Sequence, residues 1–259
     1  MLFRRGTLRH CMTHEPSPDS AADIKALVRE TMAWGVFNSS LMHENRYVPR
    51  DDAYASRLLD QLLQAKTILP ARSELFRARK LPAAREAALH SFRPEERGAP
   101  PPGKGSGRLN PDGLPCLYSA GDATTAIAEV RPWKRTIISV ARFITERDVQ
   151  IIDLAPIADD SYASACLRAF ARAVSTPVHE GDTLSYVGTQ YVAERLRHEG
   201  IEGVKYASAL RHTGANFALF NPRDAVVKEV ALHEVLPLTY ASHMVSKASI
   251  DIARLFTPV

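Results

Sequence analysis

The chain has 259 residues, of which 45% are hydrophobic and 24% charged, and a formal net charge of +4 at pH 7. These fractions are those of an ordinary globular protein, which excludes a collagen-like or intrinsically disordered chain. No apolar stretch approaches the ~20 residues that span a bilayer, and the first residues lack the apolar core of a secretory signal, so we expect a cytoplasmic protein without membrane association.

Residues 1–70 are predicted to form a helical N-terminal extension. The stretches Ala21 to Trp34 and Asp51 to Lys66 carry apolar side chains at helical spacing, and about 18 residues before them are expected to be disordered. The apolar stripe comprises Ile24, Leu27, Val28 and Met32 in the first helix, and Leu58, Leu59, Leu62 and Leu63 in the second. We expect both helices to pack on the rest of the chain or on another subunit.

A strand with cations on one side is predicted at 73–80, SELFRARK. Period-two alternation places Arg77 and Arg79 on one face and Phe76 and Ala78 on the other. The planar guanidinium donates paired hydrogen bonds, so arginine at such a position suits a phosphate or a carboxylate.

The stretch 107–133, GRLNPDGLPCLYSAGDATTAIAEVRPW, places an arginine, a tyrosine and a glutamate on a loop, a strand and a helix in succession. It follows a loop rich in proline and glycine. A short buried strand is predicted from Leu114 to Ser119, and Asp122 can cap a helix that Pro132 ends after Arg131. This arrangement suits a site for an anionic substrate.

Glu129 and Tyr118 each have two interpretations. Glu129 falls at the edge of the apolar helix face, so its carboxylate is expected to be partly buried and able to orient a ligand hydroxyl. The alternative is an ordinary surface glutamate paired with Arg131 or Arg135. Tyr118 is either a ligand contact or a core tyrosine with a satisfied hydroxyl.

Residues 202–222 predict a strand, a turn-rich connection and a second strand from Asn216 to Phe220. Ser208 lies at the end of the first strand, where loops carry chemistry, and Gly214 lies in the connection. No Gly-x-Ser-x-Gly motif surrounds Ser208, so it is not assigned as a nucleophile, and a satisfied loop serine remains the alternative.

The remaining segments are predicted to form the scaffold of the fold. We expect strands at 135–143 and 149–154, helices at 162–174 and 184–199 with Gly200 at the end of the second, and a final strand after Ala225. The end of the chain, 233–259, is predicted to be a tail that is mobile or binds a partner.

Cysteines, histidines and basic residues show no pattern of a metal or nucleic-acid site. Cys11, Cys116 and Cys166 lack CxxC spacing and the histidines lack HExxH, so we predict free thiols and no metal. The arginines are dispersed among acidic residues, which leaves direct nucleic-acid binding as a minor alternative.

Three of these segments resemble the RES domain, a family named for an arginine, a glutamate and a serine. The matching residues are Arg77 in LFRAR, Glu129 in TTAIAEVRPW and Ser208 in VKYASALRHTGANFALF. Between them, GRLNP, LYSA, IIDL and YVGTQYVAERLRHEGIEGVKY follow in the order of the family. Leu109, where the family often has an aromatic residue, and the segment ALRHTGAN depart from its pattern. The resemblance assigns a RES domain to 71–232.

This resemblance implies an α+β fold similar to ADP-ribosyltransferases, with a mixed β-sheet core and flanking helices, and an enzyme that cleaves the nicotinamide–ribose bond of NAD. The implied catalytic residues are Arg77 on the pyrophosphate, Glu129 on the ribose, and Ser208 on nicotinamide or phosphate. The implied substrate contacts are Tyr118, Arg108, Asn110 and Asn216, and Gln190 is a candidate for holding its helix against the site.

Family members degrade NAD by hydrolysis or by phosphorolysis with inorganic phosphate as co-substrate, and some transfer ADP-ribose to a protein. We therefore expect an NAD-consuming toxin neutralised by an Xre-type helix-turn-helix antitoxin. The alternatives are a protein ADP-ribosyltransferase and a non-catalytic binding module on the same fold. Whether the chain forms a homo-oligomer is left open.

Overall fold

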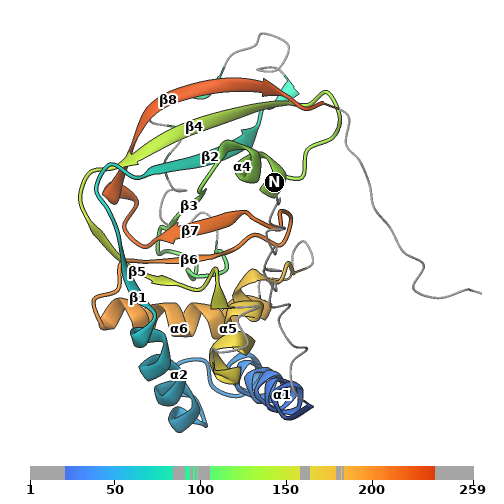
Figure 1. Ribbon diagram of the computed structural model, residues 1–259, viewed down its shortest axis with the longest axis vertical. Coiled ribbons are helices and arrows are strands. Elements are labelled where there is room, and N and C mark those ends of the chain that lie inside the picture. The colour runs from blue at the N-terminus through green and yellow to red at the C-terminus, as the bar shows by residue number, and fades with distance from the viewer. Residues whose placement is uncertain are drawn as a thin grey trace, which may run out of the picture.

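The computed structural model describes residues 21–83, 91–93, 96, 98, 106–157, 164–178, 182 and 184–236. Its core is an eight-stranded sheet with the strand order β1-β5-β6-β7-β3-β2-β4-β8 (Figure 1). Only β5 and β6 pair in parallel, and the other neighbours are antiparallel. The strands are β1 Lys66–Leu69, β2 Glu74–Lys80, β3 Leu117–Ala120, β4 Ile137–Thr145, β5 Val149–Asp153, β6 Gly203–Ala207, β7 Ala215–Leu219 and β8 Ala225–Glu234.

Helices lie against this sheet in two places. Four of them gather beside β1, β5 and β6 at one end of the molecule, while the short helix α4 lies beside β2 and β3 (Figure 1). The helical segments are α1 Ala21–His43, α2 Asp52–Gln64, α4 Ala123–Glu129, α5 Ala165–Ser175, α6 Val187–His198, and the 3-10 turns η3 Leu184–Tyr186 and η4 Pro222–Asp224. The α+β class with a mixed sheet and flanking helices is thereby confirmed.

The N-terminal helices share an apolar core with α5, α6 and the sheet. The ring of Trp34 on α1 meets Phe170 on α5 edge-on, with ring centroids 5.2 Å apart. Phe37 lies 5.2 Å from Tyr54 on α2 and 5.9 Å from Tyr191 on α6. These aromatic contacts fix α1 and α2 on the outside of α5 and α6.

The buried face of α1 differs from the predicted one. Only Leu27 of the predicted stripe is buried, whereas Ile24, Val28 and Met32 are exposed. The helix also continues past Trp34 to His43. The longer helix carries Trp34, Phe37 and Leu41 in line with Leu27, and burying these larger side chains removes more apolar area from water than burying the predicted stripe would.

Local signals explain where the elements near the site begin and end. Gly200 follows α6 with φ of 78°, as its predicted place at the helix end requires. The strand predicted from Leu114 begins only at Leu117, because the carbonyl of Leu114 is held by the side chain of Asn110 at 2.8 Å in a turn. Lys66 was assigned to a helix but belongs to β1, which pairs with β5 at the edge of the sheet.

Some predictions fall on residues that the structure does not describe. The expected disorder before Ala21 and nearly all of the predicted tail lie outside the described residues. Within the described part, none of the helices combines the length and the apolar character that crossing a membrane requires.

Candidate functional site

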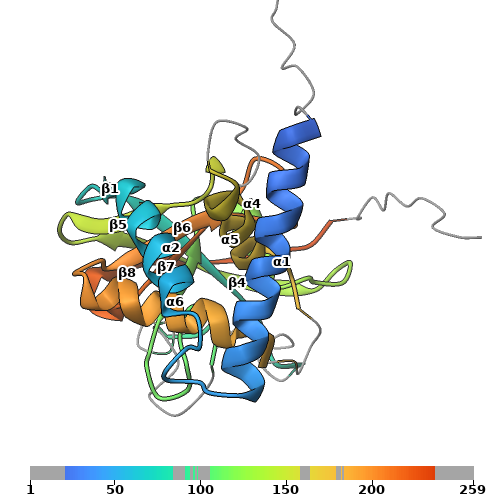
Figure 2. The same ribbon diagram turned by 90° about the horizontal axis from the view of Figure 1, so that it is seen from below.

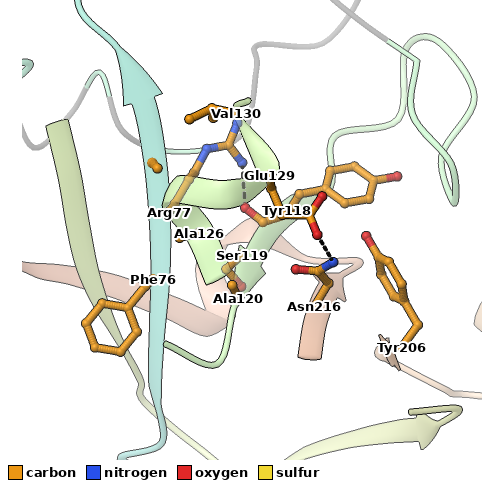
Figure 3. Close-up of a pocket in the computed structure, with 11 residues that line it drawn as sticks. Phe76, Arg77, Tyr118, Ser119, Ala120, Ala126, Glu129, Val130, Tyr206 and Asn216 are labelled. Carbon is orange, nitrogen blue, oxygen red and sulfur yellow. Dashed lines mark hydrogen bonds between the residues drawn. The ribbon is translucent and has the colours of Figure 1, made fainter. Parts of the chain in front are cut away.

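The candidate site is a cavity at the place where β2 and β3 separate. β2 pairs with β4 along its whole length, but with β3 only at Phe76 and Ala120. The cavity beside this fork has a volume of about 260 Å³. Figure 3 shows the residues that line it, which are Phe76, Arg77, Ala78, Tyr118, Ser119, Ala120, Ala126, Glu129, Val130, Tyr206 and Asn216.

Helix α4 carries Glu129 to this cavity. Its N-cap is Asp122, whose side chain accepts hydrogen bonds from the backbone N–H and the hydroxyl of Thr125 at 2.8 and 2.6 Å. This confirms the predicted cap. Glu129 is the last residue of the helix and is exposed as a whole, which corrects the expectation of a partly buried side chain. The short helix ends here, so the carboxylate reaches the cavity mouth instead of packing against the apolar face.

One oxygen of Glu129 is held by two side chains from the strand pair β6–β7. The hydroxyl of Ser208 and the amide of Asn216 both donate to Oε1, each at 2.7 Å. No described residue donates to Oε2. The predicted alternative, a surface ion pair of Glu129 with Arg131 or Arg135, is not formed among the described residues, and Arg135 lies 3.7 Å from Glu234 instead. The two donors fix the carboxylate and leave one oxygen for a ligand.

The proton and both lone pairs of the Ser208 hydroxyl are already engaged in hydrogen bonds. Its oxygen accepts from the backbone N–H groups of Leu210 and Arg211, both at 3.2 Å, while its proton goes to Glu129. A hydroxyl oxygen has one proton and two lone pairs, so all three positions are used. In this geometry the hydroxyl of Ser208 holds the carboxylate of Glu129, which is consistent with leaving Ser208 unassigned as a nucleophile.

The loop that carries Ser208 packs directly on α4. Gly214 approaches so closely that a Cβ there would lie 2.7 Å from Oγ1 of Thr125, a side chain that is fully buried. Glycine is required here by space, since no side chain fits between the loop and the helix. The contact ties Ser208 and Glu129, on different elements, to one rigid unit.

Arg77 reaches from β2 across the fork to β3. Its guanidinium donates to the carbonyl of Tyr118 at 3.0 Å (Figure 3). A guanidinium has five N–H donors in a fixed plane, so those facing the cavity suit a phosphate or carboxylate oxygen. The structure thus brings Arg77, Glu129 and Asn216 to one cavity and bonds Ser208 to Glu129, so the residues that the family resemblance implied lie close together.

The hydroxyl of Tyr118 is committed to the loop before β3. It accepts from the backbone N–H of Leu109 and donates to Oδ1 of Asn110, both at 2.8 Å. Burial raises the pKa of Tyr118 well above its ordinary value. A Cβ at Gly107 would lie 2.6 Å from this hydroxyl, so the loop wraps tightly around it. The ring lines the cavity, but the hydroxyl matches the predicted alternative of a satisfied core tyrosine.

Arg108 and Asn110 do not line the cavity but contact two residues that do. The guanidinium of Arg108 lies 5.8 Å from the ring centroid of Tyr206, and Asn110 accepts from the hydroxyl of Tyr118. Arg108 also donates to the carbonyls of Val174 and Thr176 at the end of α5, which differs from the substrate contact implied by the family. Helix ends leave carbonyls without partners, and a guanidinium satisfies two at once. Gln190 donates to the carbonyls of Gly107 and Asn110 at 2.8 and 3.1 Å, so it holds α6 against this loop as predicted.

Tyr206 is a site residue that the sequence reasoning missed. It is only 6% exposed, lines the cavity, and its hydroxyl has no hydrogen-bond partner among the described residues. In Figure 3 the hydroxyl points toward Glu129 and Asn216. Burial raises the pKa of Tyr206 above its ordinary value. Period two along β6 was the available signal, because Tyr206 lies two residues before Ser208 and shares its face.

Two further predictions concern metal and thiols. Among the described residues, no three His, Cys, Asp or Glu side chains gather in a way that could hold a metal ion. Cys116 and Cys166 are buried free thiols, and Cys11 lies outside the described residues.

The fold and the site define an α+β protein with a carboxylate and an arginine at a strand fork. The sequence matches the family model of the RES domain over residues 74–241, and the chain belongs to this family. No curated protein sequence matches the chain. Among solved structures, it is similar to a chain in the crystal structure of the M. tuberculosis MbcT–MbcA toxin–antitoxin complex, with 15% sequence identity and a TM-score of 0.39. That similarity covers 69% of this chain and 92% of the other.

Proposed function

We propose that this protein consumes NAD by cleaving the bond between nicotinamide and ribose, and that it acts as the toxin of a toxin–antitoxin pair. Membership of the RES-domain family supports the substrate. The observation that carries the chemistry is the carboxylate of Glu129, which is fixed through Oε1 by Ser208 and Asn216 while Oε2 stays available.

Cleavage of this bond develops positive charge on the ribose. A carboxylate that is already oriented stabilises such an oxocarbenium-like transition state without reorganising during the reaction. Oε2 of Glu129 accepts from a ribose hydroxyl in the bound substrate and faces the developing charge. Because these interactions strengthen in the transition state, they raise the rate of bond cleavage more than the affinity for NAD.

The other cavity residues bind and orient the substrate. Arg77 binds the pyrophosphate, and the hydroxyl of Tyr206 binds the ribose or the nicotinamide amide. The cavity of about 260 Å³ is slightly below the ~300–1,000 Å³ typical of small-molecule sites, which supports binding of the nicotinamide riboside portion there. The rest of the dinucleotide then lies along the open side of the fork, past Arg77.

The acceptor of the ADP-ribosyl group decides between three outcomes. Water gives ADP-ribose, inorganic phosphate gives ADP-ribose-1-phosphate, and a protein side chain gives an ADP-ribosylated protein. In each case the nicotinamide–ribose bond breaks and nicotinamide leaves with the bonding electron pair. The nucleophilic atom of the acceptor, which is an oxygen for water and phosphate, forms the new bond to the ribose carbon, and any proton that it carries is released to solvent. We favour water or phosphate, and an Xre-type helix-turn-helix protein as the neutralising partner, on the basis of the family.

Incubation of the purified protein with NAD, with and without inorganic phosphate, tests the proposal. Products are separated by chromatography and identified by mass spectrometry. Free ADP-ribose identifies hydrolysis, and ADP-ribose-1-phosphate that forms only with phosphate identifies phosphorolysis. NAD that stays intact in both mixtures, and also with a cell lysate that offers protein acceptors, would rule out NAD chemistry. Arg77→Ala should raise KM more than it lowers kcat, as expected for a substrate-binding residue.

A further inference from the structure

Helix α1 presents a second apolar face to solvent, opposite the face that packs on α5 and α6. Four aliphatic side chains at a spacing of four residues form this stripe, with exposed fractions of 52% for Ile24, 54% for Val28, 68% for Met32 and 72% for Val36. Side chains at this spacing follow one another along the helix surface. A helix that is apolar on both faces is typical of one that is covered on both sides.

The two halves of this stripe have complementary shapes. Ile24 and Val28 occupy the N-terminal half as exposed aliphatic side chains. The C-terminal half borders a groove of about 650 Å³, with Met32, Gly35, Val36 and Phe37 among its lining residues. The space beside Gly35 is open, since a Cβ there would meet nothing within 4 Å. The helix therefore carries both a ridge and a groove that can receive one.

We propose that this face is the interface of a homodimer, in which the α1 helices of two copies cross antiparallel about a two-fold axis near Met32. This axis places Val28 of each copy beside Val36 of the other. The exposed side chains of each N-terminal half then enter the groove of the partner. A two-fold axis requires one patch to be complementary to itself, and a ridge and a groove on either side of Met32 meet that requirement.

The charges beside the stripe favour the same antiparallel arrangement. Lys25 and Arg29 flank the N-terminal half, whereas Glu44 and Asp51 line the groove beside the C-terminal half. Arg50 also lines the groove and lies 3.5 Å from Glu44, and Arg29 lies 3.5 Å from Glu30. Beyond these two pairs, an antiparallel crossing brings Lys25 of one copy toward the acidic side of the other copy's groove, where Asp51 lies, which favours association in this orientation.

The interface is remote from the candidate site. Figure 1 shows α1 at the opposite end of the molecule from α4, and Figure 2 shows it along the outside of α5. It also precedes the residues that match the RES domain, 74–241. Dimerisation leaves both cavities open, so the proposed dimer does not depend on the proposed function. A single helix face is at the small end of interface sizes, below ~1,200 Å² in total, so the dimer dissociates on dilution.

Sedimentation velocity of the full chain over a range of concentrations tests the dimer. We expect a monomer at low concentration that converts to a dimer as concentration rises. Val28→Glu and Met32→Glu should each leave a monomer, since each buries an unpaired charge in the interface. Ile68→Glu is the matched control, because Ile68 is an exposed aliphatic residue on β1 and this variant should still dimerise. Circular dichroism verifies that each variant is folded.

Cross-linking tests the position of the axis. Met32→Cys in a Cys11→Ser background should form a disulfide-linked dimer under mild oxidation, because Cys116 and Cys166 are buried. Asp60→Cys, on the exposed side of α2, should stay monomeric on the same gel. A chain that is monomeric at every concentration would overturn the proposal, as would a dimer unaffected by Val28→Glu and Met32→Glu. Association only with a different protein would assign the face to that partner instead.

Discussion

The hydroxyl of Ser208 lies 2.7 Å from Oε1 of Glu129, although 79 positions separate the two residues in the chain. Glu129 ends a helix and Ser208 follows a strand, so neither neighbourhood determines the position of the other. Their geometry depends on the close contact between Gly214 and Thr125, which fixes the loop against the helix. The site can therefore be tested at the carboxylate, at its hydrogen-bond donor and at the contact that aligns them.

Glu129→Gln removes the negative charge and preserves the shape of the side chain. We expect NAD consumption to fall by about 10²–10³-fold, the effect typical of losing one preorganised electrostatic group. Ser208 and Asn216 can still donate to the amide oxygen, so thermal unfolding should change little. Glu146→Gln, on the exposed turn after β4, is the control and should retain full activity. Undiminished NAD loss by Glu129→Gln would remove this carboxylate from the mechanism.

Ser208→Ala should lower kcat and leave KM nearly unchanged. It removes one of the two donors to Oε1, and a hydrogen bond to a charged group contributes about 1.5–3 kcal/mol, which corresponds to roughly 10- to 150-fold in rate. Ser208→Thr keeps a hydroxyl and should recover part of the loss. Mass spectrometry of the wild-type protein during turnover provides a second test. A covalent adduct on Ser208 would contradict the positioning role.

Asp122 should stabilise the protein in a pH-dependent manner. Burial tends to raise its pKa, but hydrogen bonds from Thr125 and the charge of Arg211 outweigh it, so the pKa lies below its ordinary value. A depressed pKa means that the stabilisation is fully present above the unfolded-state value of ~3.9 and is lost as pH falls through the folded-state value. Asp122→Ala should cost about 0.5–2 kcal/mol at pH 7.

Urea unfolding of wild type, Asp122→Ala and Asp122→Asn between pH 7 and pH 3 measures this dependence. Asparagine can cap a helix but does not titrate, so the difference between wild type and Asp122→Asn should shrink below about pH 4. Asp112→Asn, at an exposed turn, should show no such trend. A difference between Asp122→Asn and wild type that is constant with pH would contradict the assignment.

The sequence predicts this part of the fold well because the signals are local. Asp122, the apolar spacing after it and Pro132 lie within one short stretch, and they determine α4 without long-range information. The buried face of α1 depends instead on which side chains meet α5 and α6. Both faces of α1 are apolar, so periodicity alone does not distinguish the face with Trp34 and Phe37 from the one with Val28 and Met32.

Prediction of the site is limited in the same way, because local patterns do not show which residues meet. Patterns placed Arg77 on a strand, Glu129 on a helix and Ser208 at a strand end, but only the family resemblance joined them. The family resemblance implies that Arg108 contacts the substrate. Its guanidinium donates instead to the carbonyls at the end of α5, and no sequence pattern indicates that proximity.

Gly214→Ala tests whether the contact between loop and helix aligns the site. The added methyl group would lie 2.7 and 2.8 Å from two atoms of the fully buried Thr125, so the loop must move. We expect the rate of NAD consumption to fall at least tenfold, since small misplacements of reacting groups have large effects. Gly121→Ala is the control, because its nearest contact of 3.5 Å is ordinary. Equal activities of the two variants would show that the contact does not position Ser208.

Two tyrosines of the cavity should respond differently to loss of the hydroxyl. The hydroxyl of Tyr118 is paired with Leu109 and Asn110, so Tyr118→Phe removes both hydrogen bonds, including the acceptor of the buried N–H of Leu109, and should destabilise the protein by about 1–3 kcal/mol. Its effect on activity, through the loop, should accompany this loss of stability.

Tyr206→Phe should instead leave stability nearly unchanged while it weakens the binding or turnover of NAD. The hydroxyl of Tyr206 has no partner among the described residues and borders the cavity, so its removal breaks no hydrogen bond between those residues. If that hydroxyl binds the substrate, kcat/KM should fall by roughly 2- to 12-fold, the equivalent of one neutral hydrogen bond of about 0.5–1.5 kcal/mol. Thermal unfolding and NAD kinetics on the same preparations measure both quantities. A Tyr206→Phe variant that loses stability and keeps full activity would assign this hydroxyl to the scaffold, since a ligand contact predicts a loss of activity without a loss of stability.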